Sequence, residues 1–107
     1  MTKTAYTVTA TLPDEQTAEE YIQWLNGGHI QAVLAGGAES AMVVRTDEPA
    51  TPLFVETRYL FPTRDALTRY LQHAAPALRA EGLARFPAER GVRFSREVGT
   101  VRGGAGA

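Results

Sequence analysis

Two stretches of this chain follow one pattern: TAEEYIQWLNGGH at residues 17–29 and TRDALTRYLQH at residues 63–73. Each opens on a threonine that can cap a helix and ends on a histidine, with an aromatic residue and a leucine before it. In the first copy, Thr17 and Glu20 also form a capping box, whose two side chains satisfy free N–H groups at a helix start. Both copies therefore predict helices that begin at their threonines.

A second, shorter helix follows each copy. Gly27 and Gly28 end the first helix, and residues 29–34 continue as another helical turn. In the second copy Pro76 suits the first turn of a new helix, while the residue before a proline resists helical geometry. The two copies are therefore expected to form two bent helical arms.

Strand-like segments flank both copies, at residues 5–12, 38–46, 52–61 and 90–101. In the first of them, apolar residues alternate with threonines, as in a strand with one buried face. The strand–helix–strand order, present twice, predicts a ferredoxin-like α+β sandwich: a βαββαβ chain with a four-stranded antiparallel sheet and helices on one face. We expect a single domain over residues 1–101 and a flexible C-terminal tail over 102–107.

The amino-acid composition excludes several kinds of functional site. The 107 residues contain no cysteine, which excludes disulfides, cysteine-based metal sites and thiol catalysis. The two histidines and the scattered carboxylates have no spacing typical of metal ligands, so we expect neither a metal nor a cofactor. The N-terminus lacks an apolar signal segment, and no apolar run is long enough to span a membrane, so we expect a cytoplasmic protein.

Charge is unevenly distributed along the chain. Residues 1–53 carry two bases and seven acids, and residues 54–107 carry nine arginines and five acids, so the halves have net charges of −5 and +4. Codon usage in a GC-rich genome explains an excess of arginine. Alternatively, the opposite charges orient a dimer or bind an anion.

The sheet face away from the helices is expected to be mixed in character. Side-chain alternation assigns to it Thr7, Thr9, Thr11, Ala41, Val43, Arg45, Phe54, Glu56, Arg58, Leu60, Arg93, Ser95 and Glu97. A second subunit on this face would bury the apolar residues and leave the polar ones lining a cavity. We therefore expect a homodimer, and no nucleic-acid partner, because RNA-binding sheets of this order expose several aromatics and this face has only Phe54.

Several short matches resemble a family of uncharacterised small bacterial proteins in the dimeric α+β barrel superfamily: Trp24, His29-Ile30, Arg58-Tyr59, Tyr70-Leu71 and Phe94-Ser95-Arg96. The resemblance covers residues 5–98 and implies ferredoxin-like subunits that pair sheet to sheet. Gly28 and Gly82 depart from it, because the family usually has an acidic residue and often a histidine there. The superfamily includes cofactor-free monooxygenases, isomerases, haem enzymes and ligand-sensing domains, so the resemblance selects no reaction.

Five residues are the candidates for a functional site. His29 is either a proton donor and acceptor at a cavity mouth or a partner for helix-end carbonyls. Glu56 is the second candidate for handling a proton. Arg58 is either an anion clamp or half of an ion pair between strands. Trp24 and Tyr59 would shape the pocket.

These residues support one function hypothesis and one rival. The first is a homodimer that binds a small polar or anionic organic ligand between its sheets, with cofactor-free acid–base or monooxygenase-like chemistry. The rival is a non-catalytic ligand-sensing or assembly module with a filled subunit interface. His73, at the end of the second helix, is assigned a structural role.

Overall fold

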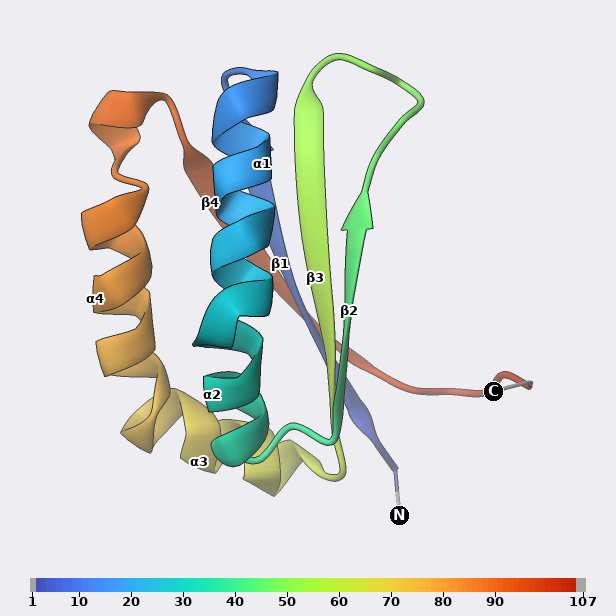
Figure 1. Ribbon diagram of the computed structural model, residues 1–107. Helices are drawn as coiled ribbons and strands as arrows, with labels where there is room; N and C mark the ends of the chain where they lie inside the picture. The colour runs from blue at the N-terminus through green and yellow to red at the C-terminus, as the bar shows by residue number, and fades with distance from the viewer. Residues whose placement is uncertain (1, 106–107) are drawn as a thin grey trace.

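A computed structural model describes residues 2–105 as a sheet covered on one face by helices (Figure 1). Along the chain its main elements are β1 (Thr4–Leu12), α1 (Glu15–Trp24), α2 (Ile30–Ala35), β2 (Ser40–Arg45), β3 (Leu53–Phe61), α3 (Arg64–His73), α4 (Ala75–Arg85) and β4 (Arg93–Thr100). A wide helical turn, Leu25–His29, joins α1 to α2, and a short 3-10 turn, Ala88–Arg90, precedes β4. This order confirms the predicted ferredoxin-like α+β sandwich.

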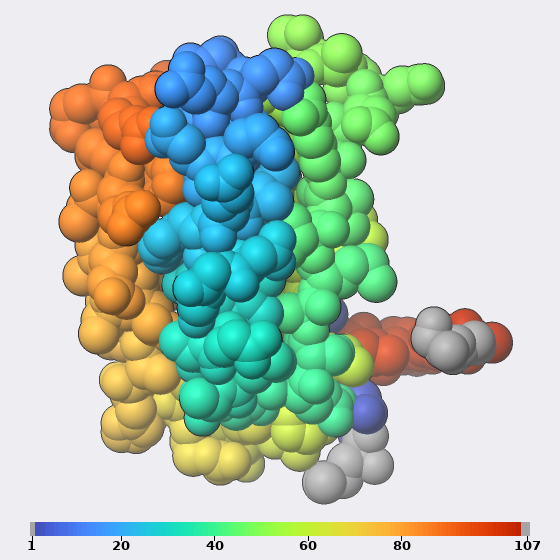
Figure 2. All heavy atoms as spheres, viewed as in Figure 1, coloured from blue at the N-terminus to red at the C-terminus, as the bar shows by residue number. Residues whose placement is uncertain are grey.

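The strands lie in the order β2-β3-β1-β4, and each neighbouring pair is antiparallel. Helices α1 and α2 form one arm across the sheet, and α4 lies beside that arm (Figure 2). Residues 101–105 leave the sheet and extend away from the globule. They include part of the predicted tail, whose residues 106–107 lie outside the described residues.

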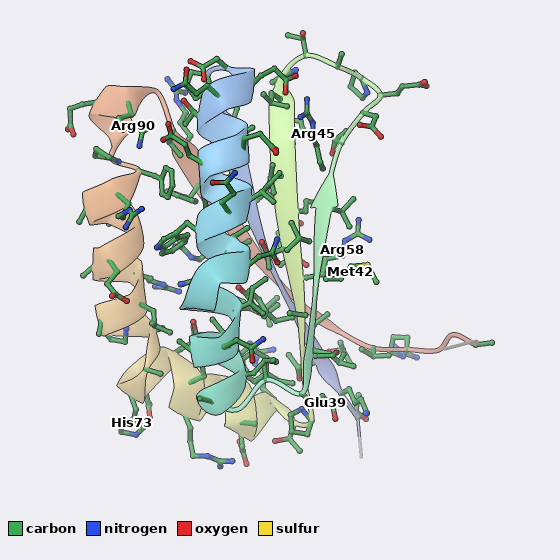
Figure 3. The ribbon with its side chains drawn as sticks, in the orientation of Figure 1. Glu39, Met42, Arg45, Arg58, His73 and Arg90 are labelled. Atoms are coloured by element: carbon green, nitrogen blue, oxygen red, sulfur yellow. The ribbon has the colours of Figure 1, made fainter. Side chains whose placement is uncertain are left out.

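The register of β2 corrects one prediction. Met42 pairs with Arg58 of β3, and both side chains project from the face away from the helices (Figure 3). Residues paired across antiparallel strands share a face, so Ala41, Val43 and Arg45 face the helices. Their predicted place on the opposite face is wrong, because β2 is apolar in both phases and only its pairing decides which phase is buried.

The start of α1 corrects a second prediction. The Asp14 carboxylate, rather than Thr17, caps this helix: its Oδ1 accepts the backbone N–H of Thr17 at 2.8 Å. This hydrogen bond is the main reason that the pKa of Asp14 lies below its ordinary value. The cap of α3 is confirmed, because Thr63 Oγ1 accepts the backbone N–H of Ala66 at 3.0 Å.

Both helical arms bend at the predicted positions, one at a glycine and the other next to a proline. Gly28 has a φ of +140°, which a residue with a side chain rarely adopts, and the chain continues directly into α2. In the other arm, Pro76 stands in the first turn of α4, next to the bend after α3. The bends let each arm follow the twisted sheet.

The core consists of two clusters on the helix side of the sheet. One contains Phe61 of β3 and Leu67 of α3, and the other contains Tyr21 of α1 and Phe86, which follows α4. The pocket described below lies where the clusters meet, because residues of both line it. Within the described residues, no helix is long and apolar enough to cross a membrane.

Candidate functional site

A small pocket of about 40 Å³ opens between the sheet, α1 and α4. Aromatic rings form most of its wall, and all four tyrosines of the chain contribute to it: Tyr6, Tyr21, Tyr59 and Tyr70. Burial raises the pKa of Tyr21 and of Tyr70 to about 12 and also raises the pKa of Tyr59. These phenols therefore stay protonated at neutral pH and can donate hydrogen bonds into the pocket.

Trp24 and His29 stand together at one side of the pocket. Their rings stack with centroids 4.1 Å apart and an angle of 23° between the planes. The turn through Gly27 and Gly28 makes this stack possible, because it brings His29 back over the last residue of α1. Nδ1 of His29 is buried and has no hydrogen-bond partner within the described part of the chain.

Burial also sets the protonation state of His29. Desolvation lowers the pKa of its imidazole below the ordinary value of 6.5, and the charge of Glu81 opposes this only weakly. The ring is therefore neutral at physiological pH. A neutral imidazole with a free, buried nitrogen is suited to accept a proton from a bound molecule.

Two arginines reach the same pocket from different elements. Arg79 of α4 donates from Nη2 to the Tyr6 hydroxyl at 3.0 Å, and Arg96 of β4 lies over the Phe94 ring at 5.9 Å from its centroid. No aspartate or glutamate lines the pocket among the described residues.

The structure brings three of the five predicted site residues together. Trp24, His29 and Tyr59 all line the pocket. Glu56 and Arg58 lie on the opposite face of the sheet, where their side chains form an ion pair at 2.9 Å. Their predicted role with a ligand stays a prediction, and it applies to a face shared with a second subunit.

Sequence reasoning missed the contribution of Tyr6 and Arg79 to the pocket. These residues are 73 positions apart, and nothing local to either indicates their contact. A signal did exist for Arg96, which falls in phase with Phe94 and so projects toward the helices.

The opposite sheet face carries a shallow apolar hollow of about 310 Å³. Met42 and Leu60 form it beside the Arg58 side chain. Met42 is 59% exposed, so its apolar side chain is open to solvent on this face. Among residues 2–105, no three His, Asp or Glu side chains are placed to hold a metal ion.

A protein-family model matches residues 3–101, and its description is a domain of unknown function, DUF4286. The chain belongs to this family. No curated protein matches the sequence of this DUF4286 domain. The predicted resemblance to an uncharacterised family of ferredoxin-like proteins is confirmed.

Solved structures share the fold of the domain at low sequence identity. A dimeric ferredoxin-like protein from an uncultured marine organism has a TM-score of 0.73 at 13% identity, over 98% of this chain and 100% of its own. A monooxygenase from the gene ActVA-Orf6 of Streptomyces coelicolor, in complex with nanaomycin D, has a TM-score of 0.75 at 17% identity, over 99% of this chain and 93% of its own. SnoaB, a cofactor-independent oxygenase from Streptomyces nogalater, has a TM-score of 0.69 at 11% identity, over 97% of each chain. Identities this low establish the fold alone.

Proposed function

We propose that this DUF4286 domain binds a small organic molecule with an aromatic ring and a polar or anionic group, and that His29 exchanges a proton with it. The observation that carries this proposal is that polar groups without an acidic partner converge in one largely aromatic pocket. They are the free Nδ1 of His29 and the guanidinium groups of Arg79 and Arg96. Apolar pockets with a few convergent polar groups are the usual form of a binding site. The ligand is thus placed on the helix side of the sheet, instead of between two sheets.

Binding requires the pocket to widen. A volume of about 40 Å³ holds a few water molecules, whereas organic ligands occupy pockets of roughly 300–1,000 Å³. Helix α4 is the wall suited to move, because only Ala75 and Gly82 of its residues are buried. Leu83, at the pocket rim, is 55% exposed and could cover a bound ring.

The proposed chemistry is cofactor-free. His29 takes a proton from a phenol or an activated carbon, and the tyrosine hydroxyls stabilise the resulting anion by hydrogen bonding. The aromatic wall supplies stacking surface for the ring. In this proposal Trp24 and Tyr59 shape the pocket.

Oxygenation is the specific reaction that we consider, because two structures of similar fold are described as a cofactor-independent oxygenase and a monooxygenase. A deprotonated, electron-rich aromatic compound can reduce molecular oxygen itself. For a ring methylene such as that of anthrone, one oxygen atom becomes the carbonyl. The other oxygen atom leaves as water with the two methylene hydrogens. The alternative is a ligand-sensing module that binds the same kind of molecule without turnover.

We also propose that the domain works as a homodimer through the sheet face away from the helices. Met42 and Leu60 give this face an apolar hollow, and the Glu56–Arg58 pair keeps its charges balanced. A solved structure of similar fold is described as a dimeric ferredoxin-like protein. In such a dimer each subunit would keep its own pocket on the outer, helical side.

The binding proposal is tested with the single tryptophan as reporter, since Trp24 lines the pocket. The probe is 2-hydroxy-1,4-naphthoquinone, a planar acidic aromatic, followed by Trp24 fluorescence and by calorimetry. Gly82→Ala should weaken binding, because a Cβ there would lie 3.3 Å from Trp24 Cη2. Gly99→Ala is the matched control, because nothing lies within 4 Å of its Cβ position.

Saturable binding that Gly82→Ala weakens and Gly99→Ala leaves unchanged supports the pocket. Absence of binding by the wild-type protein, or equal loss in both variants, contradicts it. Measuring oxygen consumption with anthrone as substrate then distinguishes the oxygenase hypothesis from the ligand-sensing alternative. In the enzyme, His29→Gln should abolish most of the consumption while probe binding persists.

A further inference from the structure

The pocket contains positive charge without a negative partner. Four ion pairs join side chains in residues 2–105, and neither Arg79 nor Arg96 belongs to any of them. Every residue that lines the pocket is apolar, aromatic, neutral or basic. Glu81 raises the pKa of His29 against the larger effect of burial, but it does not line the pocket.

The two guanidinium groups come from different walls of the pocket. Arg79 belongs to α4, and Arg96 to the edge strand β4, opposite Val8 of β1. Both residues line the same pocket, and Arg79 also reaches the Tyr6 hydroxyl there. Two cations from separate elements therefore act on the same small volume.

The present partner of Arg79 is a weak one. The Tyr6 hydroxyl is neutral and accepts one hydrogen bond from a group that can donate five. A carboxylate accepts two parallel bonds from the planar guanidinium and also neutralises its charge, so it is the stronger partner. A bound anion would thus take the place that Tyr6 now fills.

We propose that Arg79 and Arg96 select for a carboxylate on the aromatic ligand, so that the natural ligand of this pocket is an aromatic acid. The inference rests on the proposed binding function and names its substrate class. The Arg79 fork holds the carboxylate, and Arg96 adds a second charge from the other wall. The ring of the ligand lies against Trp24. In this arrangement the anion-binding role belongs to the helix side of the sheet, and Arg58 has no part in it.

The test compares two compounds of nearly equal shape, 2-naphthoate and its neutral amide, 2-naphthamide. At low ionic strength the wild-type protein should bind naphthoate at least tenfold more tightly, and added salt should reduce that preference. Arg79→Gln and Arg96→Gln should each reduce the preference several-fold, because naphthoate loses a charge interaction that naphthamide never makes. Arg79→Lys should restore part of it, because a point charge remains without the planar fork.

Arg58→Gln is the matched control, because it removes the same charge from the other face of the sheet. It should leave the preference unchanged, and thermal unfolding should verify that each variant is folded. Equal binding of both compounds by the wild-type protein, or equal effects of Arg58→Gln and Arg79→Gln, overturns the charge selection. Binding of neither compound overturns the proposed function itself.

Discussion

Thr57 offers a direct test of how polar groups are buried behind the pocket. This residue lies in the centre of β3, is 0% exposed, and faces the helices. Its Oγ1 forms no hydrogen bond of good geometry within residues 2–105, although it lies close to the Tyr21 hydroxyl. A buried hydroxyl without a partner loses its hydrogen bonds to water and gains none in return, which costs about 1–3 kcal/mol.

Thr57→Val removes this hydroxyl and keeps the shape of the side chain. The free energy of unfolding should rise by about 1–3 kcal/mol, because the desolvation cost disappears and a methyl group joins the core. At about 4–8 °C per kcal/mol for a domain of this size, the melting temperature should rise by at least about 4 °C. Urea denaturation and thermal melts followed by far-UV circular dichroism measure both quantities.

Two further variants make the result decisive. Thr9→Val, on the opposite face of β1, controls for the general preference of strands for valine and should change stability by less than about 0.5 kcal/mol. Tyr21 lies close enough to Thr57 for the threonine hydroxyl to lower the pKa of the Tyr21 phenol by hydrogen bonding, against the larger effect of burial. If Thr57→Val destabilises the protein, and a double-mutant cycle with Tyr21→Phe shows strong coupling, the hydroxyl is bonded to that phenol and the reasoning is refuted.

Three other changes test the site, the packing and the assembly. Protonation of His29 should quench the fluorescence of Trp24 with a midpoint below pH 6.5, because burial lowers the pKa, and a midpoint above 6.5 contradicts the buried ring. His29 therefore supports stability fully above pH 6.5, and this support is lost as the pH falls toward the folded-state pKa. Gly36→Ala should cost about 1–3 kcal/mol in a urea melt, because its Cβ would lie 2.9 Å from the Tyr70 ring; a neutral effect contradicts this tight packing. Met42→Glu should convert the expected dimer to a monomer in light scattering, and an unchanged dimer would place the interface elsewhere.

The fold was predictable because its signals are local. Alternation along β1 and β3, the Thr63 cap and the bend at Pro76 depend on residues within a few positions of each other. The structural predictions were wrong where two nearby residues or two strand phases could fill the same role. Asp14 and Thr17 can both cap α1, and the aspartate forms the cap one turn earlier.

The site was predictable only in part, because its residues meet through the fold. Trp24 and His29 are close in sequence, and the glycines between them indicate a turn that can bring their rings together. Arg58 was predicted to be either an anion clamp, because its planar guanidinium would line a cavity between two sheets, or half of an ion pair between strands. In the structure it pairs with Glu56 of its own strand. The contact between Arg79 and Tyr6 depends on the placement of α4, which no short pattern encodes.

Gly82 connects the packing of α4 to the proposed function. A glycine inside a helix costs about 1 kcal/mol relative to alanine, so its presence needs a compensating reason. Here the reason is space, because even one added carbon would press against Trp24, whose ring also stacks on His29. The glycine leaves α4 close to the indole but anchored by few buried side chains. Helix α4 can therefore close the pocket to a small volume when no ligand is bound. Because the helix is weakly anchored, it can also move outward when a ring-sized ligand binds.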